Sequence, residues 1–250
     1  MPGVRKHPVR KRVSGKYTEI RDHVRKHSFD GSKAVTFIIE RAMAAETRPL
    51  TILAVGKLTN IALALEKEPK IADRVRLVWL ESNYPEPGEY NQEADTTAMN
   101  LLLNSGIPFE MVTVRYGTPS GTTAVRVTKA QTLHRMPGKG PVITEPVAGR
   151  HGDHFDTFGN YSVNLFEHYE MYGEPPGRSL FDMAAVAIIK DPGWAESKTF
   201  PAPVLIDNHW IERPSNDRMI TIWEHFHIYK IMTDFFETMD EPVLVGGGSP

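Results

Sequence analysis

The stretch LTILAVGKLTNIALALEKEPKIADRVRLVWL, residues 50–80, contains two short apolar runs separated by an amphipathic segment. The runs at residues 50–55 and 75–80 have the length of strands. Between them, Leu58–Glu68 places apolar side chains three and four residues apart, which is typical of one helix face. Strand, helix and strand in this order predict a parallel βαβ unit with a right-handed crossover.

The same alternation extends on both sides of this stretch. Lys33–Glu46 has the apolar spacing of a helix, and Pro49 separates it from the first predicted strand. After residue 80, Ala94–Ser105 predicts a further helix and Phe109–Val114 a further strand. We therefore expect an α/β fold, with a mostly parallel Rossmann-like sheet flanked by helices.

The second half of the chain has a weaker pattern. Residues 117–160 are rich in Gly, Pro, Thr and His, and we expect a long irregular excursion from the core. After it we expect three helices and one edge strand, at Tyr161–Tyr172, Leu180–Ile189, Ile222–Met239 and Pro203–Ile206. The expected organisation is a single domain over residues 16–245, between a flexible basic tail at 1–15 and a flexible tail at 246–250.

The composition restricts the classes of function. The chain has 250 residues, 40% hydrophobic and 24% charged, with a formal net charge of −2. This balance does not favour nucleic acid or an anionic membrane as a partner. The absence of cysteine excludes disulfides, thiolate catalysis and Cys-bound zinc. No apolar run approaches the length of a membrane span, and the basic start lacks the apolar core of a secretory signal, so we expect a cytoplasmic protein.

A polar loop follows the predicted strand 75–80, at the sheet edge where α/β proteins bind their ligands. It contains Asn83, Glu89 and Asn91, with Asp95 at the expected start of the next helix. Amide and carboxylate groups together supply the donors and acceptors that vicinal sugar hydroxyls need. The alternative is a polar loop without a ligand, in which Asp95 caps the helix.

The motifs GKLTN at residues 56–60 and GEYN at residues 88–91, in this order and at this distance, resemble the inosine-uridine preferring nucleoside hydrolases. This resemblance covers roughly residues 30–115 well and 160–240 loosely. It implies that Asn83, Glu89 and Asn91 bind ribose. It also implies that Thr59 gives its backbone carbonyl to calcium.

A second motif of the resemblance is RSLFDMAAVA, residues 178–187. Many nucleoside hydrolases have His-Asp at the start of this helix, where the Asp binds calcium and the His assists the leaving base. Asp182 matches the ligand, whereas Phe181 replaces the His and has no proton to give. The other interpretation of Asp182 is a carboxylate favoured by the helix dipole.

The Asp-rich strand that begins the nucleoside hydrolases has no counterpart in this sequence. In the family it supplies most calcium ligands and the general base, and calcium prefers six to eight oxygens. We therefore expect a fold that is incomplete at its N-terminus: a truncated version of a longer protein or, alternatively, a degenerate relative. We expect the chain by itself to bind calcium weakly and to have little activity, and the catalytic base is unknown.

Several other polar and aromatic residues are weaker candidates. His151 and His154 of the HGDH motif, with Asp153 and Asp156 nearby, have residue types that bind metal, but a polar lid is the favoured interpretation. His225 and His227 are interpreted as ordinary histidines of the C-terminal helix. Trp210 has the flat surface to stack on a purine, although core packing of an edge-strand tryptophan is commoner.

The function that the resemblance implies is hydrolysis of the N-glycosidic bond of ribonucleosides, giving ribose and free base. The expected partner is a small-molecule nucleoside, and a homo-oligomer is possible. One alternative is a catalytically impaired relative that binds a nucleoside or sugar without a complete metal site. Another is a structural paralogue that binds no ligand.

Overall fold

The computed structural model describes residues 17–21, 24, 32–44 and 48–245. The two predicted tails, at residues 1–15 and 246–250, lie outside this part of the chain. The chain divides into two compact units, the first formed by residues 1–116 and 197–224 and the second by residues 117–196 and 225–250. The expectation of one domain over 16–245 stays a prediction.

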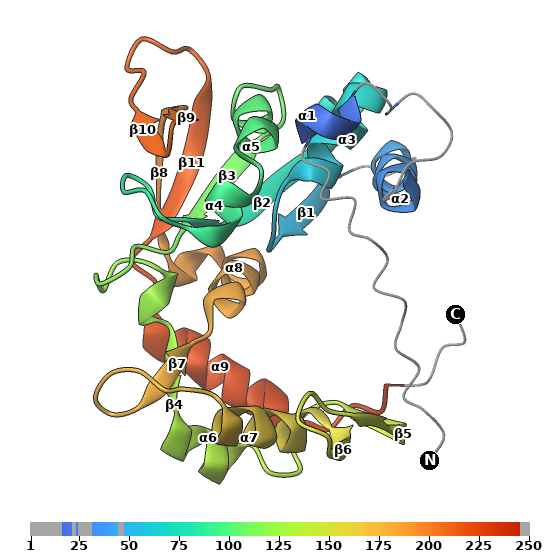
Figure 1. Ribbon diagram of the computed structural model, residues 1–250, viewed down its shortest axis with the longest axis vertical. Coiled ribbons are helices and arrows are strands. Elements are labelled where there is room, and N and C mark those ends of the chain that lie inside the picture. Colours follow the sequence, from blue (N-terminus) through green and yellow to red (C-terminus); the bar gives the residue numbers. More distant parts are fainter. Residues whose placement is uncertain (1–16, 22–23, 25–31, 45–47, 246–250) are drawn as a thin grey trace. The chain divides into compact units, whose positions relative to one another are not determined.

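The first unit contains a five-stranded sheet with the strand order β1-β2-β3-β11-β8 (Figure 1). β1 pairs with β2, β2 with β3, and β3 with β11, and all three pairs are parallel. The strands span Leu50–Ala54 (β1), Val75–Ser82 (β2), Phe109–Thr113 (β3), Glu196–Pro201 (β8) and Met219–Glu224 (β11). The predicted α/β class with a mostly parallel sheet is confirmed.

Helices pack against one face of this sheet. Apolar side chains of the helices and of that face of the sheet form one core. Leu77 and Trp79 of β2 point to the same face, since side chains alternate along a strand. They share one apolar core with Leu63 of α3 and Leu102 of α5. The helices of this unit are α1 (Tyr17–Ile20), α2 (Ser32–Met43), α3 (Thr59–Lys67), α4 (Tyr90–Ala94) and α5 (Thr96–Leu103), with the short 3₁₀ helix η2 (Pro69–Asp73).

A two-stranded hairpin completes the first unit. β9 (Val204–Ile206) pairs antiparallel with β10 (His209–Ile211), as predicted for a strand near residues 203–206. The two turn residues Asp207 and Asn208 have φ of 47° and 60°. These values fit the two-residue turns that join tightly twisted strands.

The second unit combines helices with two small antiparallel sheets. β4 pairs with β7, and β5 with β6. Its apolar core is centred on Val127, Met136 and Phe236. The strands are Arg126–Thr128 (β4), Val142–Ala148 (β5), His154–Thr157 (β6) and Gly177–Ser179 (β7), and the helices are Lys129–Arg135 (α6), Phe158–His168 (α7), Phe181–Lys190 (α8) and Ile228–Asp240 (α9), with the 3₁₀ turns η3 (Thr122–Ala124) and η4 (Pro192–Trp194).

Two expectations for the second half of the chain are wrong. Residues 117–160 are not irregular, because they include β4, α6, β5 and β6. The predicted helix Ile222–Met239 is divided: residues 222–224 belong to β11, and the helix α9 begins only at Ile228. His225 and His227 therefore lie between a strand and a helix and not inside a helix.

Among the described residues, no helix combines the length and the apolar character that a membrane crossing requires.

Candidate functional site

The candidate site lies where β2 ends. Ser82, Asn83 and Tyr84 are buried at this point, and the loop then leads to Glu89 and the short helix α4. β2 runs parallel to both of its neighbours, so its carboxyl end faces the edge of the sheet where α/β proteins place their ligands. The sequence prediction for the location of this loop is confirmed.

Asn83 joins the loops that follow β2 and β3. Its side-chain amide donates a hydrogen bond to the Pro87 carbonyl oxygen at 2.8 Å. Its side-chain carbonyl accepts from the backbone N–H of Tyr116 at 3.0 Å. A primary amide has two N–H groups, and these contacts use one of them. The second N–H has no hydrogen-bond acceptor among the described residues.

Glu89 and Asn91 lie at the start of α4, and both are buried. Glu89 is the N-cap residue of this helix, and its Oε2 accepts from the backbone N–H of Gln92 at 2.8 Å. Asn83, Glu89 and Asn91 thus belong to one short segment between the end of β2 and the start of α4. Their assignment as ribose-binding residues stays a prediction.

Asp95 connects the starts of three helices, α1, α3 and α5. Its Oδ1 accepts from the Ala98 N–H at 3.2 Å, which makes it the N-cap of α5 as the sequence predicted. Its Oδ2 accepts from the Tyr17 N–H at 2.7 Å and from the Thr59 hydroxyl at the start of α3. The Thr59 side chain is therefore occupied within the fold, and the calcium prediction for Thr59 concerns only its backbone carbonyl.

Asp182 belongs to the second unit, at the start of α8. Its side chain is exposed, yet partial burial raises the pKa of the carboxyl above its ordinary value. Among the described residues, no basic side chain forms an ion pair with it. A site shared by Asp182 and Glu89 stays a prediction.

This raised pKa makes the stability dependent on pH. Between the unfolded and the folded pKa of Asp182, the folded state binds more protons, so stability falls as pH rises through this interval. We expect Asp182→Asn to unfold at a higher urea concentration than the parent at pH 7. The gain should disappear below about pH 3, where the carboxyl is neutral in both states. Equal midpoints of the two proteins at every pH would contradict this expectation.

The HGDH motif is held by contacts of its own. The ring of His151 stacks on His168, with centroids 4.4 Å apart and an interplanar angle of 10°. Asp153 accepts a hydrogen bond from the amide of Asn164 at 3.1 Å. Parallel stacked imidazoles aim their nitrogens along separate planes, so this pair does not present two ligands to one ion. The arrangement gives no support to a metal site at His151 and Asp153.

Trp210 packs into the core, as the favoured interpretation predicted. Tyr84 contacts the Trp210 ring edge-on and stacks on Phe200, with centroids 5.3 Å apart in both pairs. Burial, and then a hydrogen bond to Glu212, raise the pKa of the Tyr84 phenol, so its hydroxyl remains a donor. These aromatic side chains anchor the residue that follows Asn83.

The sequence interpretation missed a charged cluster where β3 and β11 end. Arg115 follows β3 with a φ of 48° and forms an ion pair with the buried Glu224 at 2.7 Å. Lys198 of β8 contacts the same carboxylate at 2.8 Å. Charged residues directly after the predicted strand Phe109–Val114 were the available signal. Glu224 itself was hidden because its strand was interpreted as a helix.

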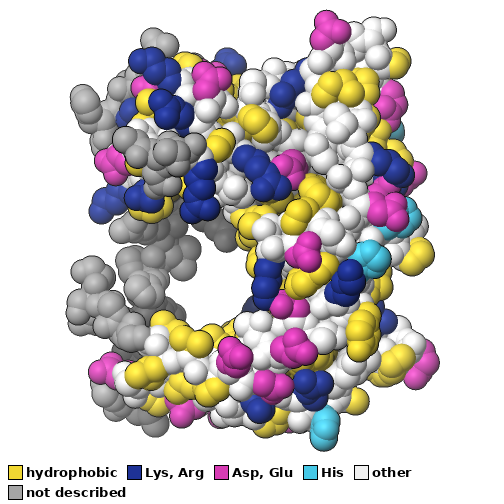
Figure 2. Space-filling model, turned by 180° about the vertical axis from the view of Figure 1, so that it is seen from behind, with side chains coloured by type: hydrophobic (Ala, Val, Ile, Leu, Met, Phe, Trp, Pro, Cys, Tyr) yellow, Lys and Arg dark blue, Asp and Glu magenta, His cyan; other side chains and the backbone are white. Residues whose placement is uncertain are grey.

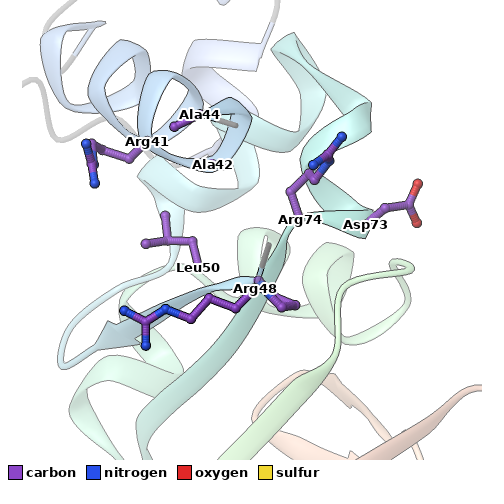
Figure 3. Close-up of a pocket in the computed structure, with 8 residues that line it drawn as sticks. Arg41, Ala42, Ala44, Arg48, Leu50, Asp73 and Arg74 are labelled. Carbon is purple, nitrogen blue, oxygen red and sulfur yellow. The ribbon is translucent and has the colours of Figure 1, made fainter. Parts of the chain in front are cut away.

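A separate cavity of about 180 Å³ lies at the opposite end of the sheet. Leu50 and Arg74, at the beginning of β1 and just before β2, contribute to its wall together with Arg41 and Arg48 (Figure 3). The guanidinium groups of Arg41 and Arg48 extend to one side and that of Arg74 to another (Figure 3). Basic side chains also gather on this part of the first unit in Figure 2. The three guanidinium groups do not converge on one point, so this cavity is not the candidate site.

Comparison with solved structures shows the class of fold. A plant nucleoside hydrolase superposes with a TM-score of 0.65 and 18% identity, over 84% of this chain and 67% of that one. The fold is thus that of the nucleoside hydrolases. The sequence model of the inosine-uridine preferring nucleoside hydrolases matches residues 3–239, and the chain belongs to this family.

Two curated relatives match shorter segments. An uncharacterised protein of Schizosaccharomyces pombe is 35% identical over 117 residues, which are 44% of this chain and 37% of that protein. The pyrimidine-specific ribonucleoside hydrolase RihB of Shigella flexneri is 28% identical over 153 residues, 58% of this chain and 44% of that protein. The chain therefore matches less than half of the length of either relative.

Proposed function

We propose that this protein hydrolyses the N-glycosidic bond of ribonucleosides and releases ribose and a free base. The observation that carries the proposal is the linked arrangement of Asn83 and Glu89 at the carboxyl end of β2, in a member of the nucleoside hydrolase family. Inosine and uridine are the first substrates to test, because the family is named for them. RihB of Shigella flexneri is described as pyrimidine-specific.

The proposed site recognises ribose through its hydroxyl groups. A sugar hydroxyl both donates and accepts, so it pairs best with amides and carboxylates placed together. Asn83 and Asn91 provide amides, and Glu89 provides a carboxylate that accepts only. All three side chains are buried, where such hydrogen bonds are stronger than in water.

The proposed reaction breaks the bond between C1′ and the base nitrogen, and the electron pair leaves with the base. Positive charge then develops on C1′ and the ring oxygen, as in other glycoside hydrolases. The carboxylate of Glu89 stabilises this charge more than it stabilises the neutral substrate. A water oxygen adds to C1′ and loses a proton, and the departing base gains one. No residue of the chain is assigned as the activator of this water.

The resemblance to the family implies calcium, and the described residues only partly fit it. We propose the backbone carbonyl of Thr59 and the carboxylate of Asp182 as the ligands that this chain supplies. Among the described residues, however, no three His, Asp or Glu side chains lie together as a metal site requires. Calcium prefers six to eight oxygens, so these two residues do not form a complete site.

The remaining functional expectations are proposals of the same kind. A small-molecule nucleoside is the proposed partner, and assembly into a homo-oligomer stays a prediction. The absence of cysteine is compatible with a reducing compartment and motivates the proposed cytoplasmic location.

Nucleoside binding tests the proposed role of Asn83. Asn83→Asp keeps an oxygen for the Tyr116 N–H but removes the amide donors, and it adds a negative charge to the candidate site. We expect the dissociation constants of inosine and uridine, measured by calorimetry, to rise at least tenfold. This change corresponds to the loss of roughly one hydrogen bond between the protein and the nucleoside.

Asn104→Asp is the matched control. The amide of Asn104 also donates to a carbonyl, that of Asn100 at 2.6 Å, and its side-chain oxygen also accepts, from Arg213 at 2.7 Å. Asn104 follows α5 and precedes β3, at the other end of the sheet. Equal effects of the two substitutions on nucleoside affinity would refute the assignment of Asn83.

A further inference from the structure

Gln92 connects the two halves of the candidate site. It lies in α4 and its side chain is fully buried. The side-chain oxygen Oε1 accepts two hydrogen bonds, from the backbone N–H of Asn83 at 3.1 Å and from the Ser82 hydroxyl at 3.2 Å. The backbone N–H of the same residue donates to Oε2 of Glu89 at 2.8 Å. One residue therefore contacts both Asn83 and Glu89.

The Gln92 side chain acts at the end of β2, where the pairing with β3 is irregular. The pairing of β2 with β3 becomes irregular between Leu80 and Ser82, directly before Asn83. Ser82 extends the contact, because its hydroxyl oxygen accepts from the Tyr84 N–H at 3.1 Å. Through Gln92 and Ser82, three consecutive residues after the regular ladder are tied to α4.

The carbonyl of Gln92, and not its NH₂ group, makes these contacts. Oε1 uses both of its lone pairs on Ser82 and Asn83, whereas Nε2 is buried without a hydrogen-bond partner among the described residues. A buried amide nitrogen without a partner is unfavourable, and an apolar residue of similar size would avoid it. What glutamine adds to the fold is therefore the hydrogen-bond acceptor Oε1, which is fixed between the Ser82 hydroxyl and the Asn83 N–H.

We propose that Gln92 is a positioning residue, which sets the spacing between Asn83 and Glu89 through its side-chain carbonyl and its backbone N–H. This inference rests on the proposed function, because the spacing matters only if both side chains hold the same ribose. Gln92 itself does not contact substrate. It acts through Asn83, whose remaining amide N–H must face the sugar.

Two substitutions separate the acceptor from the shape of the side chain. Gln92→Met keeps the length and removes the acceptor, whereas Gln92→Glu keeps a carbonyl oxygen at the position of Oε1, because burial favours the neutral, protonated carboxyl. In Gln92→Met, we expect the backbone amide of Asn83 to exchange its hydrogen about tenfold faster than in the parent protein, because roughly one hydrogen bond is lost. Gln92→Glu should stay within about threefold of the parent protein. The amide of Met99 in α5 reports whether the unit remains folded.

Kinetics on inosine and uridine supply the second measurement. In Gln92→Met, KM should rise about tenfold, with kcat lowered less, because ground-state ribose binding is lost first. In Gln92→Glu, KM should stay close to that of the parent protein. Glu93→Gln, which changes an exposed residue of the same helix, should alter neither value.

Each outcome decides the proposal. Unchanged exchange at Asn83 in Gln92→Met, with Met99 still protected, would overturn it, and so would faster exchange with an unchanged KM. If the parent protein neither binds nor cleaves nucleosides, the proposed function fails, and a role in positioning a ribose site fails with it. The exchange data would then still show separately whether Gln92 holds the loop.

Discussion

Replacement of Asp95 by alanine is expected to lower the free energy of unfolding by about 3–4 kcal/mol. Asp95 is fully buried and accepts from three donors, the backbone N–H groups of Tyr17 and Ala98 and the Thr59 hydroxyl. Loss of a helix N-cap costs about 1 kcal/mol, and each buried donor left without a partner costs about 1–3 kcal/mol. Urea unfolding followed by circular dichroism measures the change.

Asp191→Ala is the control for this prediction. Asp191 is exposed and caps the short helix η4 with one hydrogen bond, to the Gly193 N–H at 2.8 Å. Its replacement should cost about 1 kcal/mol or less. If Asp95→Ala costs no more than Asp191→Ala, the contacts at Asp95 do not hold α1, α3 and α5 together.

Glu89→Gln is expected to lower kcat on ribonucleosides by about 100-fold or more, with a change in KM of about threefold or less. Glutamine still offers an oxygen to the Gln92 N–H, so the cap of α4 is kept while the negative charge is lost. That charge is needed mainly when the sugar becomes cationic, so the effect should appear in kcat.

Steady-state assays of the two glutamates of this segment provide the comparison. Glu93 is exposed in the same helix, and Glu93→Gln removes the same charge four residues from Glu89. Its kcat should equal that of the parent protein. A similar kcat loss in both variants would indicate a general electrostatic effect, and no loss in either would remove Glu89 from the reaction.

Local periodicity was sufficient to predict the strands and the longer helices of the first unit up to residue 114. The strands at 50–54, 75–82 and 109–113 begin at the predicted residues, because parallel strands buried on both faces are continuous apolar runs. The helix α3 also lies where it was predicted, and its bounds differ from the prediction by only one residue at each end. These elements follow one another along the chain, so their pairing requires no knowledge of distant segments.

The strand β11 was not predicted, because its partner is distant in sequence. Ile220, Ile222 and Trp223 suit a strand, but they run directly into a helical pattern, and only pairing with β3 distinguishes the two structures. The helix α6 was missed for a different reason. It begins with a capping box of Thr128 and Gln131, a signal present in the sequence that was obscured by its Gly- and Pro-rich surroundings.

The position of the segment that carries the candidate site was predicted, but its internal contacts were not. The order of strand and polar loop located Asn83 and Glu89 correctly at the end of β2. The burial of Gln92 could not be predicted, because a glutamine in a short polar helix is usually exposed. Its importance depends on an irregularity after Leu80 that only the folded sheet shows.

Ribose release from inosine and uridine tests the central claim most directly. The parent protein and Glu89→Gln are incubated with each nucleoside in the presence of calcium, and ribose and free base are both quantified. We expect the parent protein to release ribose and base in equal amounts, even if slowly, and Glu89→Gln to lose this release. Nucleosides that remain intact with the parent protein, or equal release by both proteins, would contradict the account.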